Sequence, residues 1–207
     1  KHHRFQHLYA WFLSGLMTIQ WSIEKDFSQL VRYHKKGLLK IQKKNFSKEL
    51  KLLIFYKIIY YGYALILPLM FFKTWWLVLI GYFAMHYTAG IILAVVFQCA
   101  HVMEPNDFKS PNKERTIKKN WFEHQLNTTC NFAMNSKLLS WFIGGLNFQI
   151  EHHLFPNICH IHYKKLSKIV QSTAKDFDIP YKSYKNMFSA VYNHYKFLKH
   201  LGTLKIS

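Results

Sequence analysis

Apolar runs alternate with polar segments along this chain, and two of the runs have the length of a membrane span. Residues 52–72 carry a single charge, Lys57, and residues 75–98 carry none. Because a helix needs roughly 20 apolar residues to cross a bilayer, the two runs are predicted to form a transmembrane helical hairpin, with Lys57 reaching toward the interface. A buried hairpin of a soluble protein is the alternative interpretation.

A shorter apolar run at residues 8–23 precedes the hairpin. It falls short of the spanning length, so we expect it to form a helix that lies in the membrane interface. After the hairpin the pattern becomes that of amphipathic helices, with apolar residues at helical spacing from Tyr163 to Val170. Pro180 predicts the end of that helix, and residues 184–201 fit a second one.

These patterns predict an all-α fold in a single domain. The interfacial helix at 8–23 and the hairpin at 52–72 and 75–98 form its integral membrane part, and residues 99–207 form amphipathic helices outside the bilayer.

The charge of the chain indicates which side of the membrane these parts face. The formal net charge is +18 although half of the residues are apolar, and ten lysines and arginines fall within residues 24–57. Cytoplasmic loops carry an excess of Lys and Arg, so this segment is predicted to be cytoplasmic. Because a hairpin returns the chain to the same side, residues 1–7 and 99–207 are expected there too. The predicted location is the inner membrane of a bacterium, or the endoplasmic reticulum of a eukaryote.

Such a basic chain could instead bind nucleic acid. However, the basic segment adjoins two runs of membrane length, and the sequence contains no helix-turn-helix, zinc-finger or RNA-binding signature. We therefore predict no nucleic-acid partner. The three cysteines, Cys99, Cys130 and Cys159, form no CxxC pair, which argues against a zinc ribbon or a disulfide scaffold and favours three reduced thiols used as small apolar residues.

One short segment, from Asn147 to Pro156, has the pattern of a metal site. On a helix, Gln149, His152 and His153 stand at positions i, i+3 and i+4, so their side chains share one face. Two imidazoles and an amide oxygen can then converge on one metal region. Glu151 points elsewhere and is expected to accept a hydrogen bond from a ligand imidazole.

The string Asn147-Phe148-Gln149-Ile150-Glu151-His152-His153-Leu154-Phe155-Pro156 resembles the third histidine box of the membrane-bound fatty-acid desaturase family. It is closest to the front-end subfamily, whose box has Gln in place of the first His, and to bacterial linoleoyl-CoA desaturases. His101, directly after the second long run, is similar to the family histidine at the end of the last membrane helix. The similarity extends to the opening Arg4–Tyr9 segment and to the stretch from Trp121 to Asn131, and so covers nearly the whole chain.

The resemblance implies a reaction and its cofactors. It implies an oxygen-dependent desaturase that inserts a cis double bond into a fatty acyl chain, carried as acyl-CoA or acyl-lipid, at a histidine-ligated centre of two iron ions (Fe2+). O2 would be the co-substrate, and an electron-transfer protein such as cytochrome b5 or ferredoxin the electron donor. The implied iron ligands are His101, Gln149 (directly or through water), His152 and His153, with no catalytic residues besides them. The basic face could hold anionic lipid head groups or the phosphates of coenzyme A.

The sequence departs from the family in lacking its first two histidine boxes, which are expected upstream of Lys1. The chain is therefore expected to be the C-terminal part of the enzyme and inactive by itself. His3 and His7 have HxxxH spacing, but their context matches the segment after the second box. His124 is expected at the surface or beside a ligand, and His160 and His162 as capping or solvated residues. His86, inside the second run, either faces the acyl chain or partners a neighbouring helix.

Two other activities stay open at the level of the sequence. A related membrane di-iron enzyme could hydroxylate the acyl chain or form an acetylenic bond, because the outcome depends on how the substrate is positioned. A non-catalytic protein that kept the fold and lost the metal is the third possibility.

Overall fold

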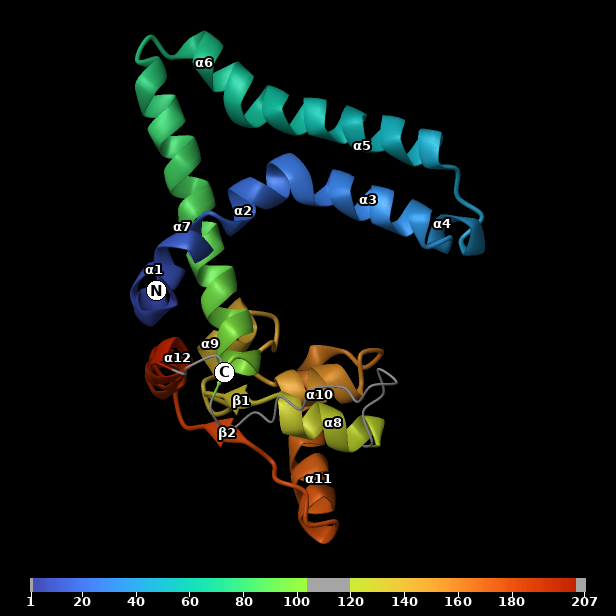
Figure 1. Cartoon of the computed structure of the whole chain (residues 1–207), viewed down its shortest axis with the longest axis vertical. Helices are drawn as coiled ribbons and strands as arrows, with labels where there is room; N and C mark the ends of the chain where they lie inside the picture. Colours follow the sequence, from blue (N-terminus) through green and yellow to red (C-terminus); the bar gives the residue numbers. More distant parts are fainter. Residues whose placement is uncertain (1, 104–119, 204–207) are drawn as a thin grey trace. The chain divides into compact units, whose positions relative to one another are not determined.

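The computed structural model describes residues 2–103 and 120–203, which divide into two compact units (Figure 1). The hairpin unit comprises Ala10–Ala94. The C-terminal unit comprises Lys1–Tyr9 together with Val95–Ser207. The described part of the chain is mostly helical, in agreement with the predicted fold class.

The hairpin unit opens with a series of short helical segments in place of one straight helix. These are α1 (Gln6–Gly15, whose first residues belong to the C-terminal unit), α2 (Met17–Gln20), the π-helical turn η2 (Trp21–Lys25), α3 (Asp26–Lys35) and α4 (Leu38–Ile41). Gly37 separates α3 from α4 with a φ of 71°, a left-handed conformation that glycine adopts without steric cost. The run predicted at 8–23 is therefore helical but broken at Leu16, and its position in the interface stays a prediction.

The first predicted span begins earlier than its apolar run. It consists of α5 (Phe46–Tyr61), the π-helical turn η3 (Gly62–Ile66) and α6 (Leu67–Phe71). The Asn45 side chain accepts hydrogen bonds from the backbone N–H of Ser47 and Lys48, and this cap starts the helix ahead of the apolar residues.

Lys57, expected to reach toward the interface, is paired within the hairpin unit, and its position relative to an interface stays a prediction. Its Nζ lies 2.7 Å from a carboxylate oxygen of Asp26 and donates to the carbonyl of Ser22 at 2.5 Å. That carbonyl belongs to the π-helical turn η2. The single charge of the apolar run 52–72 is thus paired with Asp26 of α3 within the unit.

The second span is one unbroken helix, α7 (Trp75–His101), which runs through both units. Phe46–Phe71 and Trp75–His101 are each long and apolar enough to cross a membrane. In the first helix, no part of the most apolar stretch is buried within the protein. In the second helix, only 17% of the corresponding stretch is buried. The core helix of a soluble protein would be mostly buried, so this exposure favours lipid-facing helices.

A polar contact joins three helices of the hairpin unit at His86 in α7. The hydroxyl of Thr18 in α2 donates to the His86 carbonyl at 2.6 Å, so it accepts from His86 Nδ1 at 3.1 Å. His86 Nε2 then accepts from the Tyr60 hydroxyl of α5 at 2.6 Å. One turn further along α7, a Cβ on Gly90 would collide with the Gly15 carbonyl oxygen, so only glycine fits there. Of the two roles considered for His86, the structure gives the interhelical partner.

The C-terminal unit consists of short helices around a two-strand ladder. Its elements are η1 (His2–Phe5), α8 (Trp121–Thr128), β1 (Asn131–Phe132), α9 (Lys137–Phe142), α10 (Gln149–Leu154), η4 (His160–His162), α11 (Tyr163–Asp176), β2 (Ser183–Tyr184) and α12 (Met187–Thr203). The strands β1 and β2 are parallel, with Asn131 opposite Ser183. Tyr184 therefore belongs to a strand and not to the predicted helix, which starts later because the Asn186 side chain caps it by accepting from Ser189 N–H.

The core of this unit surrounds the end of α7. Cys99, Ala100 and Met103 are fully buried beside Phe132 of β1 and Ala190 of α12. Cys99 and Cys130 are buried free thiols, as predicted, whereas Cys159 is free but exposed, so it does not act as a small core residue.

Several hydrogen bonds hold the end of α7 and the first residues of the chain in the C-terminal unit. Cys130 N–H donates to the Ala100 carbonyl at 2.9 Å, and His194 Nδ1 of α12 donates to the Val102 carbonyl at 2.6 Å. Gln6 donates to the Leu198 carbonyl at 2.8 Å. The end of α7, with His101, is thereby tied to β1 and α12.

Candidate metal centre

The helix α10 carries the histidine pair and is held at its start by Asn131. The side-chain carbonyl oxygen of Asn131 accepts from Ile150 N–H at 2.9 Å, and its amide donates to Glu151 at 2.8 Å. The chain enters α10 through Gly144 and Gly145, which have φ values of 60° and 74°. This left-handed pair allows the turn that directs α10 into the unit.

Three of the four predicted ligands meet in the C-terminal unit. The ring centroids of His101 and His153 are 4.9 Å apart, and those of His152 and His153 are 5.7 Å apart. His101 comes from the end of α7 and the other two from α10, so two segments about fifty residues apart in sequence supply the cluster. All three side chains are half-buried.

Each of the three imidazoles has one ring nitrogen engaged by the protein. His153 Nδ1 donates to Gln125 Oε1 at 2.9 Å. His101 hydrogen-bonds to the backbone of Thr128. His152 Nδ1 lies 3.4 Å from the hydroxyl of the buried Tyr163. Histidines that bind metals usually have their second nitrogen held in this way, which fixes the ring and its tautomer.

The protonation state of His153 suits a metal ligand. Burial, followed by the neighbouring His101 and His152 rings, lowers the pKa of His153 to about 4. The ring is therefore neutral near pH 7, and neutral imidazole is the form that coordinates a metal.

The fourth predicted ligand, Gln149, differs from the three histidines in its burial and hydrogen bonding. It is almost fully buried at the start of α10, and within the described residues its Nε2 has no hydrogen-bond partner. Such an unpaired buried amide is costly, so it points to a partner that comes from outside these residues.

Glu151 is oriented by a different set of partners than predicted. Its carboxylate is completely buried and accepts from Asn131 at 2.8 Å and from the Tyr181 hydroxyl at 2.8 Å. Burial raises its pKa, and both hydrogen bonds oppose that shift. The expected contact to a ligand imidazole is wrong, because the side chain points toward β1 and the segment after α11.

The donor set fits part of an iron site. Imidazole suits iron, and three rings that each have one nitrogen held by the protein match the way proteins present such ligands. Among residues 2–103 and 120–203, however, no three His, Cys, Asp or Glu side chains converge closely enough to hold a metal ion by themselves. The three histidines therefore do not form a complete metal site by themselves within the described residues.

The other candidate histidines take no part in the described cluster. His7 stacks edge-on against Tyr195 of α12, with ring centroids 5.1 Å apart. The backbone carbonyl of His124 accepts from the Thr128 hydroxyl. His160 and His162 are exposed at the start of α11, as predicted.

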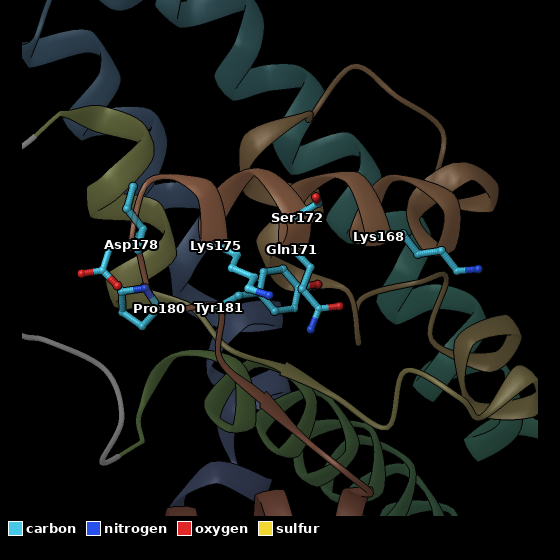
Figure 2. Close-up of a pocket in the computed structure, with 8 residues that line it drawn as sticks. Lys168, Gln171, Ser172, Lys175, Asp178, Pro180 and Tyr181 are labelled. Atoms are coloured by element: carbon cyan, nitrogen blue, oxygen red, sulfur yellow. The ribbon is translucent and has the colours of Figure 1, made fainter.

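The hollow shown in Figure 2 lies away from the histidines, beside the C-terminal end of α11. It measures about 670 Å³ and is lined by Lys168, Gln171, Lys175 and Tyr181, among others. No histidine lines it. Its link to the cluster is indirect, because the Tyr181 hydroxyl donates to Glu151 of α10.

Sequence analysis missed the residues that hold the cluster. Gln125, Thr128 and Tyr163 contact the three histidines, and Asn131 and Tyr181 hold Glu151. Apart from lying in the stretch that resembles the family, Gln125 and Asn131 carry no signal of their own, because a hydrogen bond between distant segments leaves no periodic pattern.

Comparison with known proteins adds independent information. The profile of the family described as fatty acid desaturase matches residues 1–185. The chain is 36% identical to an sn-1 linoleoyl-lipid 6-desaturase of Synechocystis sp. over 97% of its own length and 55% of that protein. It is 34% identical to an acyl-lipid (8-3)-desaturase of Physcomitrium patens over 97% of its own length and 42% of the relative. The chain thus spans about half the length of these curated relatives. No solved structure gives a significant match.

Proposed function

The chain belongs to the fatty acid desaturase family, and from this premise we propose that its protein inserts a cis double bond into a fatty acyl chain with the use of O2. The observation that carries the proposal is the cluster of His101, His152 and His153, each with one ring nitrogen already engaged. Metal-binding histidines usually have their second ring nitrogen held in this way, which supports the proposal.

In this proposal, His101, His152 and His153 each bind iron through one imidazole nitrogen. Gln149 serves as a direct or water-mediated ligand through its side-chain carbonyl oxygen, and its buried Nε2 donates to a group from outside the described residues. When bound, two iron ions with O2 and two external electrons would supply the oxidising power needed to remove hydrogen from an unactivated methylene. Such a centre needs more ligands than the described histidines provide.

The residues of this chain orient and hold the proposed ligands. Asn131 and Tyr181 hold Glu151, and through it they fix α10 between Gln149 and the histidine pair. The His194 and Cys130 contacts fix the end of α7, from which His101 projects. We assign no general base among the described residues of this chain, because hydrogen removal would rest on the bound iron and O2.

We assign the two spans to a hairpin that returns the chain to the cytoplasm. The basic segment at 24–57 and the C-terminal unit then face one compartment, by the preference of Lys and Arg for that side. Several relatives are named as acyl-lipid desaturases, which favours an acyl chain carried on a membrane lipid as the substrate. Cytochrome b5 or a ferredoxin is the proposed electron donor.

The test is product analysis of the full reading frame in a host that lacks polyunsaturated lipids. Mass spectrometry of the fatty acids should show new double bonds with the intact protein. The variants His152→Ala and His153→Ala should show none, while His160→Ala, at an exposed position, should behave as the intact protein. Hydroxylated or acetylenic products would assign the related activity instead, and unchanged acyl chains with every supplied substrate would overturn catalysis.

A further inference from the structure

We propose that Gln125 of α8 is a positioning residue for the metal centre, one that fixes the tautomer and orientation of His153. The inference rests on the proposed function, since it assigns a role toward the iron that His153 would bind. It concerns a residue outside the histidine boxes that carries no metal-ligand signature of its own.

The contact between the two side chains decides which nitrogen of His153 is available. Gln125 Oε1 has lone pairs only, so the bond of 2.9 Å requires a proton on His153 Nδ1. The proton of a neutral imidazole is then on Nδ1, and Nε2 keeps its lone pair for a metal. Without this acceptor either tautomer could form, and the ring could rotate about its side-chain bonds.

A second contact from the same helix supports this role. Thr128 stands three residues after Gln125, so both lie on one side of α8. The Thr128 backbone hydrogen-bonds to His101, whose ring centroid is 4.9 Å from that of His153. One short helix therefore holds two neighbouring rings that come from different parts of the chain.

The helix α8 is itself anchored at several points, as an orienting element must be. Asn120 caps its start by accepting from Phe122 N–H at 3.2 Å. Lys182 Nζ donates to the Asn127 carbonyl at its end at 2.7 Å. Leu126, next to Gln125, is buried against Ile150 of α10 in a shared apolar cluster. The position of Gln125 relative to α10 is thus fixed by contacts that do not involve Gln125.

A positioning role predicts a specific loss. Removing a residue that orients a metal-binding histidine typically lowers metal affinity about 10–100-fold. The Gln125→Leu variant keeps the approximate volume and removes the acceptor, so metal affinity should fall within this range. The Gln125→Glu variant keeps an acceptor oxygen and should retain the affinity. Gln171→Leu, the same change at an exposed position of α11, is the matched control.

The experiment uses purified protein from the full reading frame. Iron affinity is measured by competition with a chelator, the cobalt-substituted protein is compared by visible absorption, and thermal unfolding is recorded without metal. We expect Gln125→Leu to lose affinity about 10–100-fold and to change the cobalt spectrum, with the metal-free unfolding temperature unchanged. Gln125→Glu and Gln171→Leu should match the intact protein.

Unchanged affinity and spectrum in Gln125→Leu would overturn the inference while leaving the proposed function intact. An intact protein that binds no iron or cobalt would overturn both. A loss of affinity that accompanies an equal loss of metal-free stability would assign Gln125 a structural role only, against the proposal. If Gln125→Leu does not fold, Gln125→Met, which also lacks a strong acceptor, is judged by the same outcomes.

Discussion

The two units of this protein differ in which side chains they bury. In the hairpin unit the large apolar side chains are exposed, as Phe55 and Ile58 are, and the polar groups Lys57 and His86 are paired inside. In the C-terminal unit, by contrast, Asn131, Asn147 and Glu151 lie fully buried among apolar residues.

The difference arises from the surroundings of each unit. Hydrocarbon solvates exposed apolar side chains but offers no hydrogen bonds, so the polar groups of a spanning helix need internal partners. A unit in water buries apolar residues, and it tolerates buried polar groups only where they are paired. Here the buried polar groups of the C-terminal unit hold α10, which indicates that its core serves the histidine cluster as well as stability.

The largest expected effect is a difference in stability loss when the same substitution, Phe to Ala, is made in each of the two units. Phe132→Ala should lower the free energy of unfolding by about 3–5 kcal/mol, because a fully buried ring leaves a cavity in the C-terminal unit. Phe55→Ala should change it by less than about 0.5 kcal/mol, since that ring is 56% exposed. Thermal unfolding in detergent measures both, and equal losses would refute the distinction between the units.

A smaller effect is expected from the polar contact of the hairpin unit. Tyr60→Phe removes the hydroxyl that His86 Nε2 accepts from. Hydrogen bonds between spanning helices contribute about 0.6 kcal/mol on average, and a double-mutant cycle of Tyr60→Phe with His86→Phe should give a coupling of this size. Tyr63→Phe, at an exposed position of the same unit, is the control. A coupling of zero would mean that the contact does not stabilise the helices.

The smallest effect is a pH dependence confined to the C-terminal unit. Burial lowers the pKa of His194 below its ordinary value, and the bond to Val102 only partly opposes this. Below about pH 6.5 the unfolded chain binds a proton that the folded chain rejects, so the free energy of unfolding falls as the pH falls. Unfolding temperatures of metal-free intact protein and His194→Asn between about pH 7.5 and about pH 5.5 isolate this contribution. A variant with the same pH dependence as the intact protein would exclude it.

Hydropathy and periodicity predicted the elements of both units well. The spans at 52–72 and 75–98 correspond to Phe46–Phe71 and Trp75–His101, because a bilayer imposes a length that the sequence must show. The amphipathic helix from Tyr163 was found because its apolar face repeats at helical spacing. The helix start at Phe46 was placed too late because it depends on the Asn45 cap and not on apolar residues.

The contacts that hold the candidate site could not be predicted from hydropathy and periodicity. The histidine pair and His101 could be named from a resemblance, but Gln125 is 28 residues and Tyr163 only 11 residues from the histidine that each contacts. Which polar side chains meet at such irregular sequence separations depends on how the whole fold packs, and no local sequence pattern reveals it. For the same reason, the ion pair between Lys57 and Asp26 was not predicted.

The continuity of α7 across both units constrains how this protein can change. Every residue inserted into a helix rotates the residues after it by about 100° and advances them by about 1.5 Å. An insertion between Ala94 and His101 would therefore turn His101 away from Gln125, Thr128 and His153, whereas an added residue at the Trp75 end would leave it in place. A change of helix length at the Trp75 end of α7 would thus leave the histidine contacts in place.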